Sequence, residues 1–175
     1  MVSRAQFLRG DLRGKEVPVR PPWAISEAAF TDSCSRCGDC IKVCTEKIII
    51  KGRSGFPEVN FNLGECTFCG ECVETCPEPL LFNDWQTTPP WDLKANINER
   101  CLAMQRVVCA SCRDGCEVRA IRMRPQVGAV PIPEIDSTVC TGCGACFKAC
   151  PDSAIDMIHA ADKPIEHINK NKEMY

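Results

Sequence analysis

Cysteine constrains this chain more than any other residue: sixteen of the 175 residues are cysteine, and they form four groups of four. We call the groups motifs 1 to 4 in chain order. Motifs 1, 2 and 4 share the spacing C-x2-C-x2-C-x3-C, whereas motif 3 keeps the last two intervals and lengthens the first. The members are Cys34, Cys37, Cys40 and Cys44 (motif 1); Cys66, Cys69, Cys72 and Cys76 (motif 2); Cys101, Cys109, Cys112 and Cys116 (motif 3); and Cys140, Cys143, Cys146 and Cys150 (motif 4).

The repeated spacing is that of bacterial ferredoxins, in which cysteine thiolates bind [4Fe–4S] clusters. Three cysteines at x2 intervals can surround three iron corners of one cluster, because each iron takes one soft thiolate. The fourth cysteine, after x3, binds the neighbouring cluster instead, so that motifs work in pairs. The sequence therefore predicts four [4Fe–4S] clusters with all sixteen cysteines as ligands.

Disulfides and zinc are the other uses of closely spaced cysteines. Disulfides need an oxidising compartment and suitably placed Cα atoms, and four cysteines within eleven residues, three times over, make an odd disulfide framework. Zinc sites usually combine two C-x2-C pairs that are separated by a longer stretch. The spacing favours iron–sulfur clusters over both.

Adjacent motifs are predicted to share clusters. The first cysteines of motifs 1 and 2 are 32 residues apart (34 to 66), and the last three of motif 3 precede those of motif 4 by 34 residues each (109 to 143). Pairing motif 1 with motif 4 and motif 2 with motif 3 remains the alternative. The adjacent assignment groups Cys34, Cys37 and Cys40 with Cys76; Cys66, Cys69 and Cys72 with Cys44; Cys101, Cys109 and Cys112 with Cys150; and Cys140, Cys143 and Cys146 with Cys116.

The segments between the motifs predict an α+β fold: a duplicated bacterial two-[4Fe–4S] ferredoxin fold with two βαββαβ halves, in which short hairpins and helical turns surround the clusters. Short apolar runs typical of strands occupy residues 48–51, 56–61, 80–82, 120–123, 130–135 and 154–158. The predicted units are a basic N-terminal arm (1–33), the first two-cluster half (34–82), a linker (83–98), the second two-cluster half (99–158) and a polar tail (159–175).

Three features other than the cysteines themselves need an interpretation. The insertion 102–108 in motif 3 is apolar and long enough for about two helical turns, which would shield that cluster from water. Trp85 and Trp91 in the linker either pack between the halves or meet a partner, and packing is favoured because large aromatics are usually buried. Five arginines lie in and just after motif 3, and they could form a solvated face, balance the charge of the clusters or make a docking patch. They are Arg106, Arg113, Arg119, Arg122 and Arg124.

Charge and compartment narrow the classes of protein. The formal net charge is −2, and four clusters at about −2 each, thiolates included, bring the loaded protein to about −10. No stretch reaches the ~20 apolar residues of a membrane span, and no secretory signal is expected. Residues 3–9 resemble a twin-arginine export motif that lacks its second arginine. We therefore expect a cytoplasmic protein with no membrane span and no nucleic-acid partner.

Several short stretches resemble the NapF family, the ferredoxin-type accessory proteins of the periplasmic nitrate reductase system. The resemblance covers about residues 20–158, and its most specific part is the irregular motif 3. The stretches that carry it are residues 20–23, 34–37, 55–61, 91–93, 101–105 and 109–116.

The resemblance implies a maturation factor that contacts the catalytic subunit of periplasmic nitrate reductase in the cytoplasm before export, with a role in cluster loading or redox adjustment. The alternative is an electron-transfer ferredoxin, or the electron-transfer subunit of a soluble oxidoreductase. The chain has no glycine-rich nucleotide loop and no Ser/His/Asp or Cys/His constellation that suggests independent catalysis. It is therefore not expected to be an enzyme.

Overall fold

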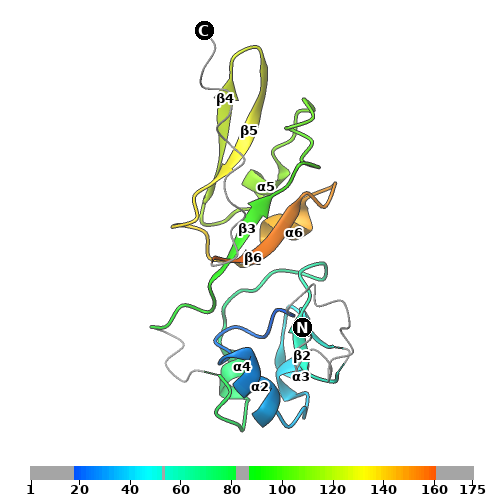
Figure 1. Ribbon diagram of the computed structural model, residues 1–175, viewed down its shortest axis with the longest axis vertical. Coiled ribbons are helices and arrows are strands. Elements are labelled where there is room, and N and C mark those ends of the chain that lie inside the picture. The colour runs from blue at the N-terminus through cyan, green and yellow to red at the C-terminus, as the bar shows by residue number, and fades with distance from the viewer. Residues whose placement is uncertain (1–17, 53, 82–86, 161–175) are drawn as a thin grey trace, which may run out of the picture.

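The computed structural model describes residues 18–52, 54–81 and 87–160, which form two halves (Figure 1). The first half (residues 18–81) contains α2 (Glu27–Ser33), α3 (Asp39–Val43), β1 (Ile49–Lys51), β2 (Pro57–Val59) and α4 (Glu71–Glu74). The second half (residues 93–160) contains β3 (Leu93–Ile97), α5 (Ser111–Asp114), β4 (Ile121–Gln126), β5 (Ala129–Ile135), α6 (Ala145–Ala149) and β6 (Ile155–His159).

The second half has two antiparallel strand pairs with short helices between them. Its outer strands β3 and β6 pair with Leu93 opposite His159, and β4 and β5 form a hairpin that projects away from the first half (Figure 1). Strand β3 lies within the segment 83–98 that was predicted to be a linker, and His159 of the predicted tail belongs to β6. The second half therefore begins at Leu93 rather than at residue 99.

The first half is a reduced version of the same arrangement. Its central hairpin pairs β1 with β2, as predicted from the runs at 48–51 and 56–61. In place of the outer strand pair it has a single antiparallel bridge between Ala24 and Leu81. The strand predicted at 80–82 is thus limited to this bridge, and Phe82 lies outside the described residues. Both halves mix short helices with short strands, which is consistent with a duplicated ferredoxin fold.

A repeated apolar pair supplies much of the buried core. The two residues that lie four and five positions after the last cysteine of each motif are between 1% and 5% exposed in all four motifs. Each pair follows the last cysteine of its motif within five residues. The aliphatic side chains therefore pack against cysteines rather than in a separate core. The pairs are Ile48 with Ile49, Leu80 with Leu81, Ala120 with Ile121, and Ala154 with Ile155.

Residues 18–33 belong to the first half, although the sequence predicted an arm over 1–33. Trp23 is 4% exposed, and its indole N–H donates to the carbonyl of Thr88 at 2.7 Å. Helix α2 buries Phe30 at 2% exposure and ends where Cys34 becomes extended. Residues 1–17 lie outside the described residues.

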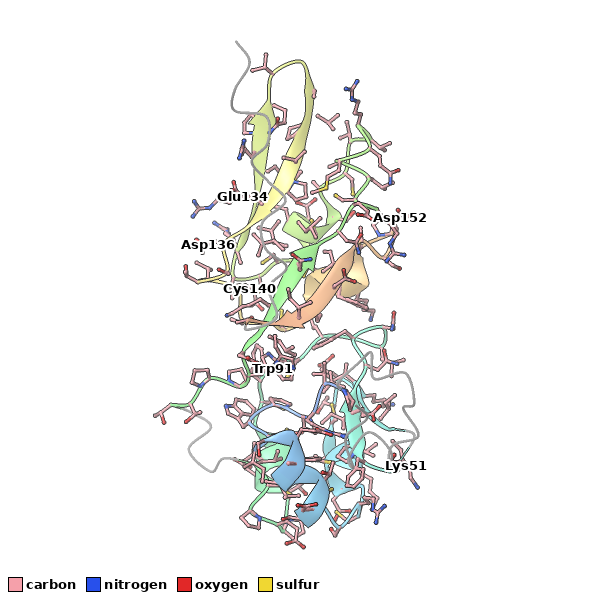
Figure 2. The ribbon with its side chains drawn as sticks, in the orientation of Figure 1. Lys51, Trp91, Glu134, Asp136, Cys140 and Asp152 are labelled. Atoms are coloured by element: carbon pink, nitrogen blue, oxygen red, sulfur yellow. The ribbon has the colours of Figure 1, made fainter. Side chains whose placement is uncertain are left out.

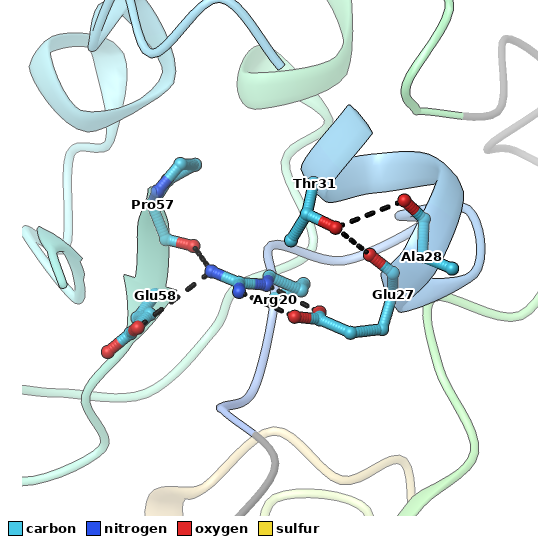
Figure 3. Close-up of polar contacts among 6 residues, drawn as sticks. All are labelled: Arg20, Glu27, Ala28, Thr31, Pro57 and Glu58. Carbon is cyan, nitrogen blue, oxygen red and sulfur yellow. Dashed lines mark hydrogen bonds and ion pairs between the residues drawn. The ribbon is translucent and has the colours of Figure 1, made fainter. Parts of the chain in front are cut away.

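Arg20 fixes this segment to the rest of the first half (Figure 3). Its guanidinium donates twice to the Glu27 carboxylate, at 2.7 and 2.8 Å, and once to the carbonyl of Pro57 at 3.0 Å. The same group lies over the rings of Phe30 and Phe56, 5.3 and 5.5 Å from their centroids. A residue predicted to be part of a basic arm is therefore a buried ion-pair partner.

The two halves meet around Trp91, which Figure 2 labels where the chain passes between them. The Trp91 ring packs edge-on against Phe61 and Phe68 of the first half, with centroids 5.9 Å away in both cases. Its indole N–H donates to the carbonyl of Thr141 in the second half at 3.1 Å. The prediction that Trp91 packs between the halves is confirmed, whereas Trp85 lies outside the described residues.

Candidate iron–sulfur cluster sites

Four cavities gather the sixteen cysteines into sets of four. Each cavity combines three cysteines of one motif with the fourth cysteine of the adjacent motif, and we number the cavities by the motif that contributes three. The adjacent assignment groups the cysteines in this way, and the alternative pairing across the halves does not. The sets are Cys34, Cys37, Cys40 and Cys76 in cavity 1; Cys44, Cys66, Cys69 and Cys72 in cavity 2; Cys101, Cys109, Cys112 and Cys150 in cavity 3; and Cys116, Cys140, Cys143 and Cys146 in cavity 4.

The cavities suit a group with several metal atoms better than a single ion. They enclose between about 320 and 420 Å³ of space not filled by protein, part of it open to solvent. Across the described residues, no three His, Cys, Asp or Glu side chains converge closely enough to hold one metal ion. Four thiols around a larger space are the donor set that a [4Fe–4S] cluster takes.

Glycine starts the helix beside three of the four cavities. Gly38, Gly70 and Gly144 stand between the second and third cysteines of motifs 1, 2 and 4, and their φ angles are +81°, +81° and +88°. Glycine adopts this left-handed conformation without the steric cost that a Cβ brings. The turn lets the chain reverse around the cavity before α3, α4 and α6 begin. The repeated C-G-x-C in the sequence could have identified these glycines, although the cysteine spacing alone did not.

Motif 3 uses a different backbone path. Ala110 replaces the glycine, with φ at −137°. The insertion 102–108 forms irregular turns rather than the predicted two helical turns: the N–H of Gln105 donates to the Cys101 carbonyl, and that of Val107 to the Leu102 carbonyl. Cys101 is buried, but Val108 is 82% exposed. The insertion therefore covers the sulfur without forming the predicted apolar helix.

Backbone N–H groups point at two of the fourth cysteines. The N–H of Ala120 donates to Cys116 Sγ at 3.3 Å, and that of Ala154 donates to Cys150 Sγ at 3.2 Å. The residue before each of these alanines has a positive φ, which turns the N–H back toward the sulfur. Hydrogen bonds of this kind stabilise a thiolate relative to a thiol.

Burial acts in the opposite direction on the deeper thiols. Burial, together with neighbouring cysteines, raises the pKa of Cys66, Cys72 and Cys146 to about 12 and that of Cys40 and Cys112 to about 11. Without a positive partner these groups are therefore protonated at neutral pH. A metal centre is the partner that makes such a thiol ionise, because its charge outweighs the cost of burial.

The arginines that the sequence singled out are all exposed. Arg113 pairs with the neighbouring Asp114 at 2.7 Å, and Arg122 lies opposite Glu134 in the β4–β5 ladder. Arg106 and Arg119 have positive φ angles of 65° and 54°. The arginines are therefore exposed, and acidic neighbours partly compensate the charge of Arg113 and Arg122.

Comparisons with known proteins match the segments that carry the cysteine motifs. A model of a 4Fe–4S dicluster domain matches residues 19–81, and a second such model matches residues 105–154. No helix within the described ranges is long and apolar enough to cross a membrane.

The curated relatives cover nearly the whole chain. The ferredoxin-type protein NapF of Haemophilus influenzae is 43% identical over 166 aligned residues, and the match covers 89% of this chain and 93% of that protein. NapF of Escherichia coli K12 is 42% identical over 160 residues, 90% of this chain and 96% of that protein. The methylamine utilization ferredoxin-type protein MauM of Methylobacillus flagellatus is 31% identical, over 79% of this chain and 68% of that protein. On this evidence the chain is an iron–sulfur protein of the ferredoxin type and belongs to the NapF family.

Proposed function

We propose that the chain holds four [4Fe–4S] clusters, one in each cavity, and acts as a cytoplasmic accessory protein for periplasmic nitrate reductase. In this role it contacts the catalytic subunit before export and supports its maturation through cluster loading or redox adjustment. The observation that carries the proposal is the four matched cysteine sets, and membership of the NapF family supports the partner. The role requires no catalytic site in this chain.

The protein supplies ligands, shielding and orientation. Bound clusters would give the chain one-electron chemistry, with potentials that depend on hydrogen bonds to sulfur and on exposure to solvent. The N–H groups of Ala120 and Ala154 would stabilise the ligand charge on Cys116 and Cys150. Cys37 and Cys69 are exposed, so that cavities 1 and 2 each have one side open to a partner.

Iron analysis tests the cofactor part of the proposal. The anaerobically purified protein should contain about sixteen irons with matching acid-labile sulfide, four for each cavity. Cys76→Ser should disturb the site otherwise formed by motif 1, and Cys44→Ser should disturb that of motif 2. Zinc without sulfide would contradict the cluster assignment. Loss at the motif that contains the substitution would contradict the crossed ligand sets.

Affinity capture of the nitrate reductase precursor tests the partner. Reversing the charge of the exposed Arg113, Arg119 and Arg122 should weaken capture, more strongly at low salt, while the iron content stays constant. Deleting residues 1–17 tests the basic terminus without touching Arg20. The charge-matched control reverses Lys42, Lys47 and Lys51, which are exposed on the first half.

Three outcomes are informative. Weakened capture by the arginine variant alone supports a docking surface on the second half. Equal weakening by the lysine control would mean that net charge, not this surface, governs binding. Failure of the unaltered protein to capture the precursor, with rapid electron exchange with a soluble oxidoreductase, would replace the maturation role with that of an electron-transfer ferredoxin. The contact between the loops of motifs 2 and 4 favours this second candidate, because it links the two halves at their cysteine loops.

A further inference from the structure

The cysteine loops of the two halves touch each other directly. The N–H of Cys66 in motif 2 donates to the carbonyl of Cys143 in motif 4 at 2.8 Å. Nearby, Lys148 of α6 donates to the carbonyl of Leu63 at 3.2 Å. The first bond joins backbone atoms of the two halves, and the second joins the Lys148 side chain to the backbone of the first half. Together they fix the distance between the loops around cavities 2 and 4.

Aromatic side chains fill the space beside this contact. Trp91 packs edge-on against Phe61 and Phe68, and Phe61 also meets Phe147 of α6, with ring centroids 6.3 Å apart. Phe61 is 5% exposed, which is unusual burial for a side chain at a boundary between two small units. We call Trp91, Phe61 and the loop residues Cys66 and Cys143 the junction.

Two glycines of motif 4 allow the close approach. A Cβ on Gly142 would lie 2.5 Å from the carbonyl oxygen of Leu93 and 2.7 Å from Nε1 of Trp91. A Cβ on Gly144 would lie 2.0 Å from the ring of Phe61. Gly38 occupies the same position in motif 1 with a similar φ, yet a Cβ there meets nothing within 4 Å. The close contact is therefore specific to the loop that faces the other half.

The outer strands of the second half show which cavities are near the junction. Ala95 and Met157, the middle pair of the β3–β6 ladder and two residues closer to its Leu93 end than Ile97, line cavity 4. Ile97 and Ile155, at the far end of the same ladder, line cavity 3. Cavity 4 therefore lies on the side of the first half, and cavity 3 lies at the outer end of the molecule.

We propose that Trp91 and Phe61 are positioning residues that hold cavities 2 and 4 as neighbours, so that the two halves are electronically coupled at this junction. The inference rests on the proposed cluster content and adds to it the point of contact between the halves. An electron that passes there leaves a site in one half and enters a site in the other, with no bond made or broken. Cavities 1 and 3 contribute no residue to the junction.

The matched substitutions Gly144→Ala and Gly38→Ala test the junction in the full-length, cluster-loaded protein. Both place an alanine at a left-handed position between the second and third cysteines of a motif, but only the methyl group at position 144 collides with Phe61. In Gly144→Ala the amide of Cys66 should exchange with deuterium roughly tenfold faster than in Gly38→Ala, because its hydrogen bond to Cys143 opens. Trp91→Ala should act like Gly144→Ala, and Trp91→Phe should retain part of the protection.

Electron paramagnetic resonance of the reduced protein gives the second measurement. The magnetic interaction between the two halves should weaken in Gly144→Ala and Trp91→Ala and persist in Gly38→Ala when the spectra are normalised to the measured iron content. If Gly144→Ala and Gly38→Ala behave alike in both measurements, the proposed role of the junction is wrong. A protein without clusters would refute the proposed function instead, while the Cys66 exchange rates would still show whether the junction exists.

Discussion

At the scale of single residues, the cysteines experience two opposing influences. Burial raises the pKa of thiols such as Cys66 and Cys146 and so favours the protonated form. At Cys116 and Cys150, the sulfur accepts a hydrogen bond from a backbone N–H group. If the proposed clusters are bound, their charge would allow the deep cysteines to ionise, whereas these two fourth cysteines also have a hydrogen-bond donor from the protein itself.

Cluster retention should fall as the pH is lowered. The pKa values of Cys40 and Cys112 are raised to about 11 and those of Cys66, Cys72 and Cys146 to about 12, so protons compete strongly with iron for these sulfurs. Each such ligand releases close to one proton on binding iron anywhere below pH 9. The loss of visible absorbance under anaerobic conditions should accelerate steadily between neutral and mildly acidic pH.

The stability of the metal-free chain should depend on pH in the opposite direction, which provides a control. For a group whose pKa is raised on folding, the stabilising contribution is complete below the unfolded value of 9.0 and disappears as the pH rises through 11 to 12. Any residual structure in the reduced, metal-free chain should therefore melt at alkaline pH, as followed by circular dichroism. Cluster loss that is independent of pH would contradict the assignment of buried thiols as ligands.

At the scale of elements, Arg20 anchors helix α2 to the hairpin of the first half. Arg20→Ala should destabilise the loaded protein by about 3 kcal/mol, because it leaves the partly buried carboxylate of Glu27 without its partner. Arg20→Lys should recover only part of the loss, since lysine cannot form the bidentate pair with Glu27 or lie flat over Phe30. Thermal unfolding under anaerobic conditions measures both effects.

Lys42→Ala is the matched control, because it removes an ion pair of comparable length that is exposed. Lys42 bonds Asp39 at 2.8 Å, but the two side chains are 74% and 43% exposed. Pairs of this kind contribute little to stability. A loss of stability in Lys42→Ala as large as that in Arg20→Ala would show that the burial of Arg20 does not matter.

The elements that the sequence predicted are those that residues close together along the chain determine. The hairpins β1–β2 and β4–β5 could be read from apolar runs joined by short turns, and the adjacent cysteine sets from their spacing. Strand β3 could not, because its partner β6 lies about 60 residues away along the chain. The insertion 102–108 was wrongly predicted as a helix: seven helical residues would span about 10 Å, whereas Cys101 and Cys109 face the same cavity.

At the scale of the whole molecule, the buried core of the described residues is divided among three clusters, in each of which apolar side chains lie against cysteines. The described core clusters include cysteines in every case, and the largest fully buried side chains are Phe30, Ile48 and Leu93. So small a core leaves much of the folding free energy to ligand binding. Removing the iron with a chelator under reducing conditions should therefore unfold most of both halves.

Amide exchange and circular dichroism measure this loss. The first half retains the Arg20 anchor and should lose protection more slowly than the β4–β5 hairpin, whose tip residue Val127 is fully exposed. A metal-free protein with native-like protection and a cooperative melt would show that the clusters are bound by a framework that is already folded.

Each cysteine set of the second half combines residues of motif 3 with residues of motif 4. The parts of the chain before and after the β4–β5 turn would therefore be joined through both sets. A protease that cuts the exposed turn between Val127 and Gly128 would divide the second half into two pieces. The upstream piece would keep three ligands of cavity 3 and one of cavity 4, and the downstream piece would keep the reverse. Each fragment would thus complete the other's proposed cluster site, so the nicked protein should migrate as one particle until its iron is removed.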